Sequence, residues 1–574
     1  MQCSIEETNV VRPRANYHPD LWGDRFFNYT PPDTVIQGQM EQAAVVFKEL
    51  VRQELLVNDK DPKERLAFLD DVHRLGVAYH FEDEIEDIFQ KFYNKFYVDS
   101  CYEDDLHYVS LRFRLLRQHG FFVSCDVFEN FKCEDKGFKD FLASDVQGLL
   151  NLYEASYLGV HGEKTLDEAR AFATTHLTSF ATQLSSPMAE QVAHALKLPL
   201  QRRSIRLESR HQISFYESKL CNNETLLKFA KLDFNLLQIL HNTELRDLTR
   251  WWRSVDMEKK LPFVRHRLVE VYFWILGVYY EPKYSYARML LNKLCKILSI
   301  VDDIYDAYGT IEELKSFTKA IQRWDKSCID QFPSYLREMY QVILDTFQEI
   351  EQNLALEQRS FGVYLLQQQM NVTCQAYLHE AMWRHENVVP TFDEYMKNAI
   401  GSSGYLYVIT ASFIGMGELA TKDAFESVDR TTKAQKASCI LARLLNDIAS
   451  HEFEKKRNHV SSAIDCYMDQ FGTSIEEATR GLQAHIEEAW KDTNDEILEP
   501  KIVPKPLLLR VINLSRTLYD MYHNAEDGYT TSTFTQEKVA KVLIHPIASS
   551  YILVLCVSFT TLDFTFVLRN LPLC

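Results

Sequence analysis

Turn-forming residues are scarce in this sequence. Only 18 of its 574 residues are glycine and 16 are proline, which together is about half the usual share in globular proteins. Turn-rich all-β proteins, collagen-like repeats and disordered chains need far more of both. The 46% of hydrophobic residues nevertheless suffice for a large core. These features favour a folded protein made of long helices.

The sequence also lacks the patterns of a zinc site, a disulfide framework, a basic nucleic-acid surface and a targeting segment. Its 12 cysteines are scattered, with no C-x-x-C pair and no histidine cluster at zinc spacing. The formal charge of −18 provides no broad basic face for a phosphate backbone. Met1 to Glu7 have neither an apolar signal core nor the acid-poor character of a transit peptide. We therefore expect no nucleic-acid partner and a reducing, cytoplasmic location.

Hydrophobic periodicity predicts helices through nearly the whole chain. Leu290 to Tyr308 carries an apolar stripe at about 100° per residue, and Ala437 to Phe453 carries another. Phe68 to Phe89 and Thr165 to Leu177 follow the same period in the first half, whereas strand-like alternation is rare. The sequence therefore predicts an all-α fold.

The polar stretch from Tyr216 to Thr225 is the best candidate for a domain boundary, because strongly periodic segments resume at Leu226. No internal repeat and no glycine- and serine-rich linker divides the chain further. We expect two large helical domains, residues 1–218 and 219–547, followed by an atypical apolar tail, residues 548–574.

Two aspartates on one of these helices are candidate metal ligands. Asp302 and Asp306 are spaced i, i+4 beside the apolar stripe, whereas Asp303 points about 100° away. Two neighbouring carboxylates at the margin of a buried face need cations, and hard oxygen ligands suit Mg²⁺. The alternative is a solvated helix face that arose by chance in a chain with 81 acidic residues.

A second helix carries another set of oxygen ligands. Asn446, Ser450 and Glu454 are spaced i, i+4, i+8 and share one face, and their amide, hydroxyl and carboxylate oxygens also suit Mg²⁺. Arg443 lies in the same sector and can reach an anion held by that metal. An ordinary surface face opposite the apolar stripe would give the same pattern.

The remaining candidates have a simpler explanation when each is taken alone. Arg265 and Arg267 flank a histidine in a basic segment that leads into a helix, which is the commoner meaning of two nearby arginines. Trp274, Tyr522 and Tyr529 are by default core aromatics.

The order of these motifs along nearly the whole chain resembles the plant terpene synthases, specifically the sesquiterpene cyclases. The segments that carry the resemblance are RPRANYHPDLWGDRF (Arg12 to Phe26), RLGVAYHFEDEI (Arg74 to Ile85), RHRLVEVYFW (Arg265 to Trp274), VDDIYDAYGTIEEL (Val301 to Leu314), RLLNDIASHEFE (Arg443 to Glu454) and DGYT (Asp527 to Thr530). Several long motifs in one order are highly specific.

The resemblance implies an N-terminal helical domain without its own active site and a C-terminal helical bundle of the isoprenoid-synthase type that holds the cavity. Asp302 and Asp306 resemble the ligands of two Mg²⁺ ions. Asn446, Ser450 and Glu454 resemble the ligands of a third, and Mn²⁺ is an alternative metal.

The resemblance also implies substrate contacts. It implies diphosphate contacts by Arg265, Arg267 and Arg443. It also implies that the catalytic step depends on four residues, Asp302, Asp306, Arg265 and Arg443. Glu380 lies in a YLHEAMW stretch that resembles a support of the first metal cluster, although Met382 replaces the more usual lysine. The residues that resemble cavity-lining aromatics are Trp274, Tyr405, Tyr522 and Tyr529, and Ser402-Ser403-Gly404 resembles a break in a cavity helix.

The activity implied is Mg²⁺-dependent ionisation of farnesyl diphosphate by a monomer, followed by cyclisation of the carbocation. A monoterpene or other terpene synthase that uses a different prenyl diphosphate is an alternative, and so is a non-catalytic helical scaffold. A chain-elongating prenyltransferase would resemble a pattern with two DDxxD motifs, whereas the second cluster here is NDxxSxxxE.

The tail departs from the family pattern, which normally stops near His545-Pro546-Ile547. Ile547 to Phe566 is nearly long enough for a membrane span of about 20 residues. Asp563, which costs up to about 3 kcal/mol deep in a bilayer, and the many Ser and Thr residues oppose that interpretation. Membrane contact through the tail is therefore the less favoured expectation.

Overall fold

The computed structural model of the chain confirms the all-α prediction. It describes residue 12 and residues 17–57, 60–95, 104–133, 137–180, 187–219, 223–356, 359–455, 460–500, 502–523, 526–531 and 533–548. In these residues the strands form only two short antiparallel pairs, β1 (Lys132–Cys133) with β2 (Gly137–Phe138) and β3 (Tyr522–His523) with β4 (Glu526–Asp527). None of the helices in this part combines the length and apolar composition needed to cross a bilayer.

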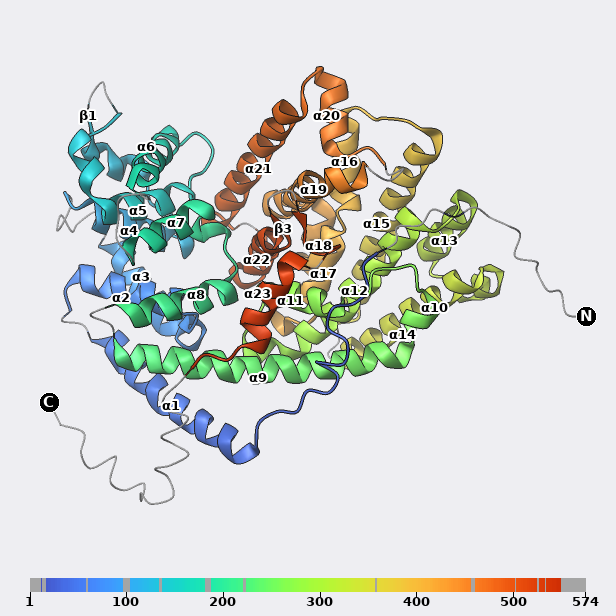
Figure 1. Ribbon diagram of the computed structural model, residues 1–574, viewed down its shortest axis with the longest axis horizontal. Coiled ribbons are helices and arrows are strands. Elements are labelled where there is room, and N and C mark those ends of the chain that lie inside the picture. Colours follow the sequence, from blue (N-terminus) through green and yellow to red (C-terminus); the bar gives the residue numbers. More distant parts are fainter. Residues whose placement is uncertain are drawn as a thin grey trace, which may run out of the picture.

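The α-helices form two groups (Figure 1). The first group contains α1 (Thr34–Leu56), α2 (Pro62–Arg74), α3 (Glu82–Asn94), α4 (Leu106–Gln118), α5 (Val146–Ser156), α6 (Lys164–Phe180), α7 (Met188–Lys197) and α8 (Ile205–Ser218). The second group contains α9 (Glu224–Val255), α10 (Met257–Lys260), α11 (Leu268–Val278), α12 (Ser285–Ala307), α13 (Ile311–Arg323), α14 (Ser334–Leu356), α15 (Phe361–Glu386), α16 (Phe392–Ser402), α17 (Tyr405–Ile414), α18 (Lys422–Arg430), α19 (Lys433–Glu454), α20 (Ala463–Phe471), α21 (Ile475–Leu498), α22 (Lys505–Met521) and α23 (Thr533–Val539).

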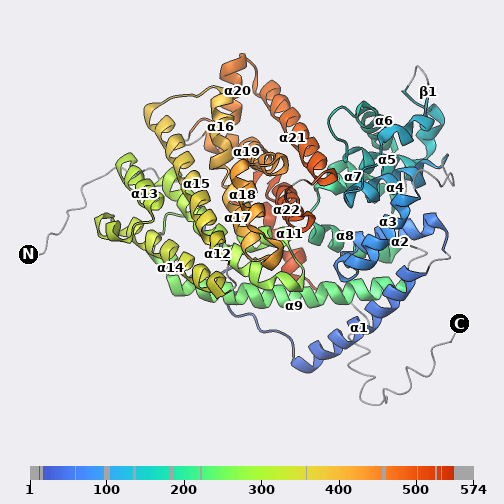
Figure 2. The same cartoon turned by 180° about the vertical axis from the view of Figure 1, so that it is seen from behind.

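Helix α9 joins the two groups, since it runs along the base of both of them in the two opposite views (Figures 1 and 2). It begins at the N-cap Asn223, whose side chain accepts a hydrogen bond from the amide of Leu226. Its first turns, with Phe229 and Phe234, are buried in the core of the N-terminal group. Leu245 and Trp252 are buried in the core of the C-terminal group. The boundary at residues 218 and 219 stays a prediction, because one helix serves both cores.

The segment before α1 packs on the C-terminal group although it precedes the N-terminal group in the chain. Trp22 and Phe26 belong to the C-terminal core, and Trp22 Nε1 donates a 2.9 Å hydrogen bond to Glu270 on α11. Further along, the structure splits the periodic stretch Phe68 to Phe89 between α2 and α3. Gly76 at the break has φ +80°, and a Cβ there would lie 2.1 Å from Ser209 Oγ, so this turn excludes other residues.

The periodic stretches of the C-terminal half are single helices, as expected. α12 covers Leu290 to Ala307, and α19 covers Ala437 to Phe453 after a capping box between Thr432 and Gln435. The Ser402-Ser403-Gly404 break separates α16 from α17. Gly404 adopts φ +70°, and a Cβ there would lie 2.9 Å from Leu298 on α12. Glycine therefore lets the chain turn while it stays packed against α12.

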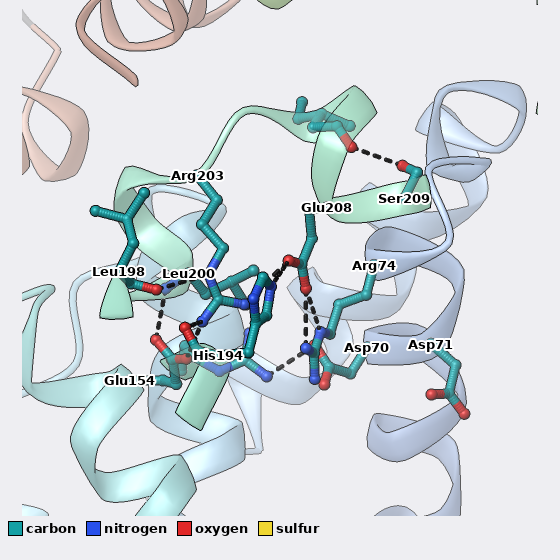
Figure 3. Close-up of polar contacts among 12 residues, drawn as sticks. Asp70, Asp71, Arg74, Glu154, His194, Leu198, Leu200, Arg203, Glu208 and Ser209 are labelled. Atoms are coloured by element: carbon teal, nitrogen blue, oxygen red, sulfur yellow. Dashed lines mark hydrogen bonds and ion pairs between the residues drawn. The ribbon is translucent and has the colours of Figure 1, made fainter. Parts of the chain in front are cut away.

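A buried charge network connects four helices of the N-terminal group (Figure 3). Glu208 on α8 accepts hydrogen bonds from Arg74 on α2 at 2.9 Å, from Arg203 at 3.0 Å and from His194 on α7 at 2.9 Å. Arg203 also bonds Glu154 on α5 at 3.3 Å. Burial alone would raise the pKa of Glu208, but the positive charges of Arg203 and Arg74 hold it well below its ordinary value.

We expect Glu208→Gln to lower the free energy of unfolding by about 3 kcal/mol at pH 7, because it leaves two buried guanidinium groups without their shared carboxylate. Since the pKa of Glu208 is depressed in the folded state, its stabilisation is present above the ordinary value of 4.5 and is lost as the pH falls below it. The measurement is urea denaturation at several pH values. Glu224→Gln, in an exposed pair with Lys228, is the matched control and should change stability by less than about 0.5 kcal/mol. Equal effects of the two variants would contradict this account of the network.

Candidate active site

A cavity of about 520 Å³ lies in the C-terminal helical group. Its volume falls within the range of about 300–1,000 Å³ that is typical of small-molecule sites. Helices α11, α12, α15, α17, α19 and α22, the α16–α17 break and the β3–β4 hairpin all contribute to its wall. The cavity is therefore enclosed by segments that are far apart in the sequence.

The carboxylates predicted on α12 reach this cavity. Asp302 and Asp306 both line it, whereas Asp303 is fully buried behind them, as the helical angles require. Burial and the neighbouring carboxylate of Asp306 raise the pKa of Asp302 to about 7. Burial and the repulsion between neighbouring carboxylates both disfavour the charged form of Asp302, and a bound cation would stabilise that form.

Arg265 forms hydrogen bonds with both Asp302 and Asp303. Its Nη2 donates to Asp302 at 2.6 Å, while its Nε and its backbone amide both donate to Asp303 at 2.7 Å. Tyr17 and Tyr529 lie against its guanidinium, with ring centroids at 5.2 Å and 5.1 Å from Cζ. Arg265 therefore presents a positive charge at the cavity wall in a fixed orientation.

The predicted ligands on α19 reach the cavity only in part. Asn446 and Glu454 line it. Ser450 is not among the lining residues, is 2% exposed, and donates its hydroxyl to the backbone carbonyl of Asn446 at 2.9 Å. Its role as a metal ligand stays a prediction, because this rotamer points its hydroxyl along its own helix.

Arg443 also lines the cavity and is anchored on three sides. It donates to the Ser402 carbonyl at 2.8 Å, at the break between α16 and α17. Its guanidinium lies 3.8 Å from Glu380 and 3.6 Å from Asp447. Glu380 therefore supports Arg443 from the cavity wall, and the helix break supplies the carbonyl that orients the guanidinium.

The structure does not bring Arg267 into the cavity. Its side chain is fully buried, and its guanidinium donates to the carbonyls of His18, Tyr529 and Thr530. These carbonyls belong to the N-terminal segment and to the segment after β4. In this arrangement Arg267 ties both segments to α11 and is not among the residues that line the cavity. Its expected diphosphate contact stays a prediction.

The expected aromatic residues form an apolar wall. Trp274, Tyr405, Tyr522 and Tyr529 all line the cavity. The Trp274 ring packs edge-on against Tyr522 and Tyr529, with centroids 5.9 Å apart in both pairs. Tyr529 is fixed further by a hydrogen bond between its hydroxyl and Ser299 on α12. Such ring faces stabilise a nearby cation through their quadrupoles.

Sequence reasoning missed two contributors to the site. Tyr17 lines the cavity from the N-terminal segment. It contacts Arg265, which lies 248 positions later in the chain, and hydrophobic periodicity cannot predict a contact between segments so far apart. Tyr377 on α15 also lines the cavity, three residues before Glu380. The i, i+3 spacing from Glu380 was the available signal, since it puts both side chains on one helix face.

The donor set suits a hard divalent cation. The cavity is lined by the carboxylates of Asp302, Asp306 and Glu454 and by the amide of Asn446, and Mg²⁺ prefers such oxygen ligands. Within the described residues, no three His, Cys, Asp or Glu side chains are close enough to form a metal centre by themselves. A cation held here therefore needs additional ligands from water or from a bound anion, which is common for Mg²⁺.

Comparison with known proteins identifies both helical groups. Residues 21–196 match the terpene synthase N-terminal domain, and residues 253–492 match the metal-binding domain of the terpene synthase family. The chain is 47% identical to (−)-germacrene D synthase of Vitis vinifera, over 94% of this chain and 96% of that one. It is 48% identical to sesquiterpene synthase 2 of Toona sinensis, over 94% and 97%.

A solved structure agrees with these sequence matches. Isoprene synthase from grey poplar leaves (Populus x canescens), in complex with three Mg²⁺ ions and dimethylallyl-S-thiolodiphosphate, superimposes with a TM-score of 0.85 at 34% identity. The match covers 92% of this chain and 99% of that one. With two domain models in order and relatives of this identity over nearly the full length, the chain belongs to the terpene synthase family.

Proposed function

We propose that the protein is a sesquiterpene synthase that ionises farnesyl diphosphate, cyclises the resulting carbocation and releases diphosphate. The observation that carries this proposal is a single cavity that combines two kinds of wall. Carboxylates, two arginines and several aromatic rings all line it. An allylic diphosphate has the same two-part chemistry, with an anionic leaving group and an apolar chain. The names of the two close relatives support the choice of a sesquiterpene product.

We propose three Mg²⁺ ions as the cofactor, with Mn²⁺ as an alternative, held by Asp302 and Asp306 and by Asn446, Ser450 and Glu454. The metal-binding domain match and the three Mg²⁺ ions of the isoprene synthase complex support this choice. Divalent cations neutralise the developing charge of the diphosphate leaving group.

The residues of the chain supply the other requirements of the reaction. Arg265 and Arg443 bind the diphosphate oxygens, because their guanidinium groups are prepositioned at the cavity wall. The rings of Trp274 and Tyr529 face the cation in the apolar part. Tyr17 closes the wall beside Arg265 and helps to exclude water, which would otherwise capture the cation before cyclisation.

A geranyl diphosphate-dependent synthase and a non-catalytic scaffold are the competing assignments. A non-catalytic scaffold does not need carboxylates and two arginines that line one cavity together with aromatic rings, whereas the binding of a diphosphate with its cations does. The geranyl alternative is disfavoured by the names of the relatives alone. A cytoplasmic location and a monomeric state stay predictions.

Incubation with geranyl, farnesyl and geranylgeranyl diphosphate tests the proposal. We expect kcat/KM to be highest for farnesyl diphosphate, with cyclic C15 hydrocarbons or alcohols as the main products in mass spectrometry. A higher value for geranyl diphosphate would replace the proposal by a monoterpene synthase. Absence of pyrophosphate release from all three substrates would favour a scaffold.

Asp302→Ala and Asp306→Ala should each lower kcat/KM by roughly two orders of magnitude or more, because each removes charge that holds the cations on the leaving group. Helix content measured by circular dichroism should stay unchanged, since Asp302 and Asp306 face the cavity and not the core. Asp345→Ala on the exposed side of α14 is the control. Full activity of either cavity variant, or of the wild type in excess EDTA, would rule out the metal assignment.

A chain that ends after Ala548 should keep kcat and KM within about twofold and be more soluble, because the truncation removes a strongly apolar segment that contains no predicted ligand or diphosphate contact. The predicted tail lies outside the described residues, apart from Ala548. The side-chain amide of Asn235 on α9 accepts a 2.8 Å hydrogen bond from the backbone amide of Ile547 and donates one of 2.9 Å to its carbonyl.

Truncation after Ile544 is the matched control, since it removes the contacts of Ile547 and should lower the thermal midpoint. Sedimentation with membranes and activity assays compare the two truncations. Loss of activity in the folded chain that ends after Ala548 would show that the tail has a catalytic role.

A further inference from the structure

Lys296 is a fully buried lysine that no step of the proposed reaction uses. It lies on α12 with no solvent exposure, and no carboxylate among the described residues forms an ion pair with it. Its Nζ donates a hydrogen bond to the backbone carbonyl of Arg265. Its Nζ also lies 5.2 Å from the centroid of the Trp252 ring. A buried ammonium group without a carboxylate is costly and needs an explanation.

Lys296 and Asp303 act on the same residue from one face of α12. They are seven residues apart, which is about two helical turns, so their side chains point in nearly the same direction. Lys296 holds the carbonyl of Arg265, and Asp303 holds its amide at 2.7 Å. The backbone of Arg265 is thus fixed on both sides, in a loop segment between α10 and α11 that has no helical hydrogen bonds of its own.

The fixed backbone determines where the guanidinium can act. Asp303 accepts a hydrogen bond from the Nε of Arg265. The two terminal nitrogens, Nη1 and Nη2, donate to Thr530 and Asp302, which line the cavity. Without the hydrogen bond from Lys296 to the Arg265 carbonyl, the backbone at Arg265 could rotate. Nη1 and Nη2 would then no longer be directed toward the cavity. Arginine recognises an anion through this planar fork, so a change in its orientation weakens the contact.

We propose that Lys296 is a positioning residue that fixes the backbone of Arg265 so that its guanidinium meets the diphosphate in one orientation. The proposal rests on the proposed function, in which Arg265 contacts the diphosphate. Lys296 itself touches neither substrate nor metal. Burial lowers the pKa of Lys296 to about 7, which agrees with an amine that serves as a hydrogen-bond donor without a carboxylate partner.

The test compares Lys296→Met with wild type. Methionine keeps a similar volume and removes the donor and the charge, so the thermal midpoint should stay the same or rise. We expect kcat/KM for farnesyl diphosphate to fall about tenfold, as loss of an oriented charge-assisted contact implies. The dissociation constant of inorganic pyrophosphate in the presence of Mg²⁺, measured by calorimetry, should rise by a similar factor.

Lys293→Met is the matched control. Lys293 lies one turn earlier on α12 and packs on the neighbouring tryptophan, with Nζ 5.5 Å from the Trp251 ring centroid. It pairs with Glu349 at the surface at 2.9 Å and does not contact Arg265 through any hydrogen bond among the described residues. Its substitution should leave pyrophosphate binding and kcat/KM unchanged.

The outcomes separate this inference from the proposed function. Pyrophosphate affinity and kcat/KM within twofold of wild type in Lys296→Met would overturn the positioning role, and so would a variant that fails to fold or loses stability in parallel with activity. Arg265→Met is measured alongside. If Arg265→Met weakens pyrophosphate binding and Lys296→Met does not, only this inference fails. If Arg265→Met has no effect, the diphosphate contact in the proposed function fails as well.

Discussion

The pairing of Arg265 with Asp302 and Asp303 is the interaction on which the geometry of the site depends. The two aspartates are adjacent on α12 and point in different directions, so one carboxylate faces the cavity and the other lies buried behind it. Arg265 contacts both and thereby fixes the segment before α11 relative to α12. The same guanidinium contacts the rings of Tyr17 and Tyr529, which bring the N-terminal segment and the segment after β4 to the cavity wall.

This arrangement combines charged groups and aromatic rings within one cavity. Polar groups of α12, α19 and the Arg265 segment line it, and the rings of Trp274 and Tyr522 lie in contact with each other in its wall. Burial strengthens the interactions of the charged groups because few water molecules screen them. The ring faces in the cavity wall can stabilise a carbocation through their quadrupoles. A reaction that creates an anion and a carbocation from one molecule matches this combination of groups.

The sequence predicted the parts of the site that are set by a single helix. Asp302 and Asp306 face the cavity and Asp303 does not, as angles of 100° per residue require. The positions of Arg267 and Tyr17 depend on how distant segments pack, which periodicity does not report. Arg267 is held by carbonyls of two remote segments, and backbone acceptors leave no pattern in a sequence. Ser450 has the correct spacing, but its rotamer satisfies a carbonyl of its own helix. The domain boundary stays a prediction for a related reason, since α9 contributes side chains to both cores.

The central claim is that the carboxylates of α12 and the oxygen ligands of α19 hold divalent cations around a diphosphate in this cavity. Anomalous diffraction from crystals grown with Mn²⁺ and inorganic pyrophosphate tests it most directly. The account predicts anomalous peaks beside Asp302 and Asp306 and beside Asn446 and Glu454, with pyrophosphate density between them and Arg265 or Arg443 in contact with it. Mn²⁺ peaks only outside the cavity, or pyrophosphate bound without any metal beside these residues, would contradict it.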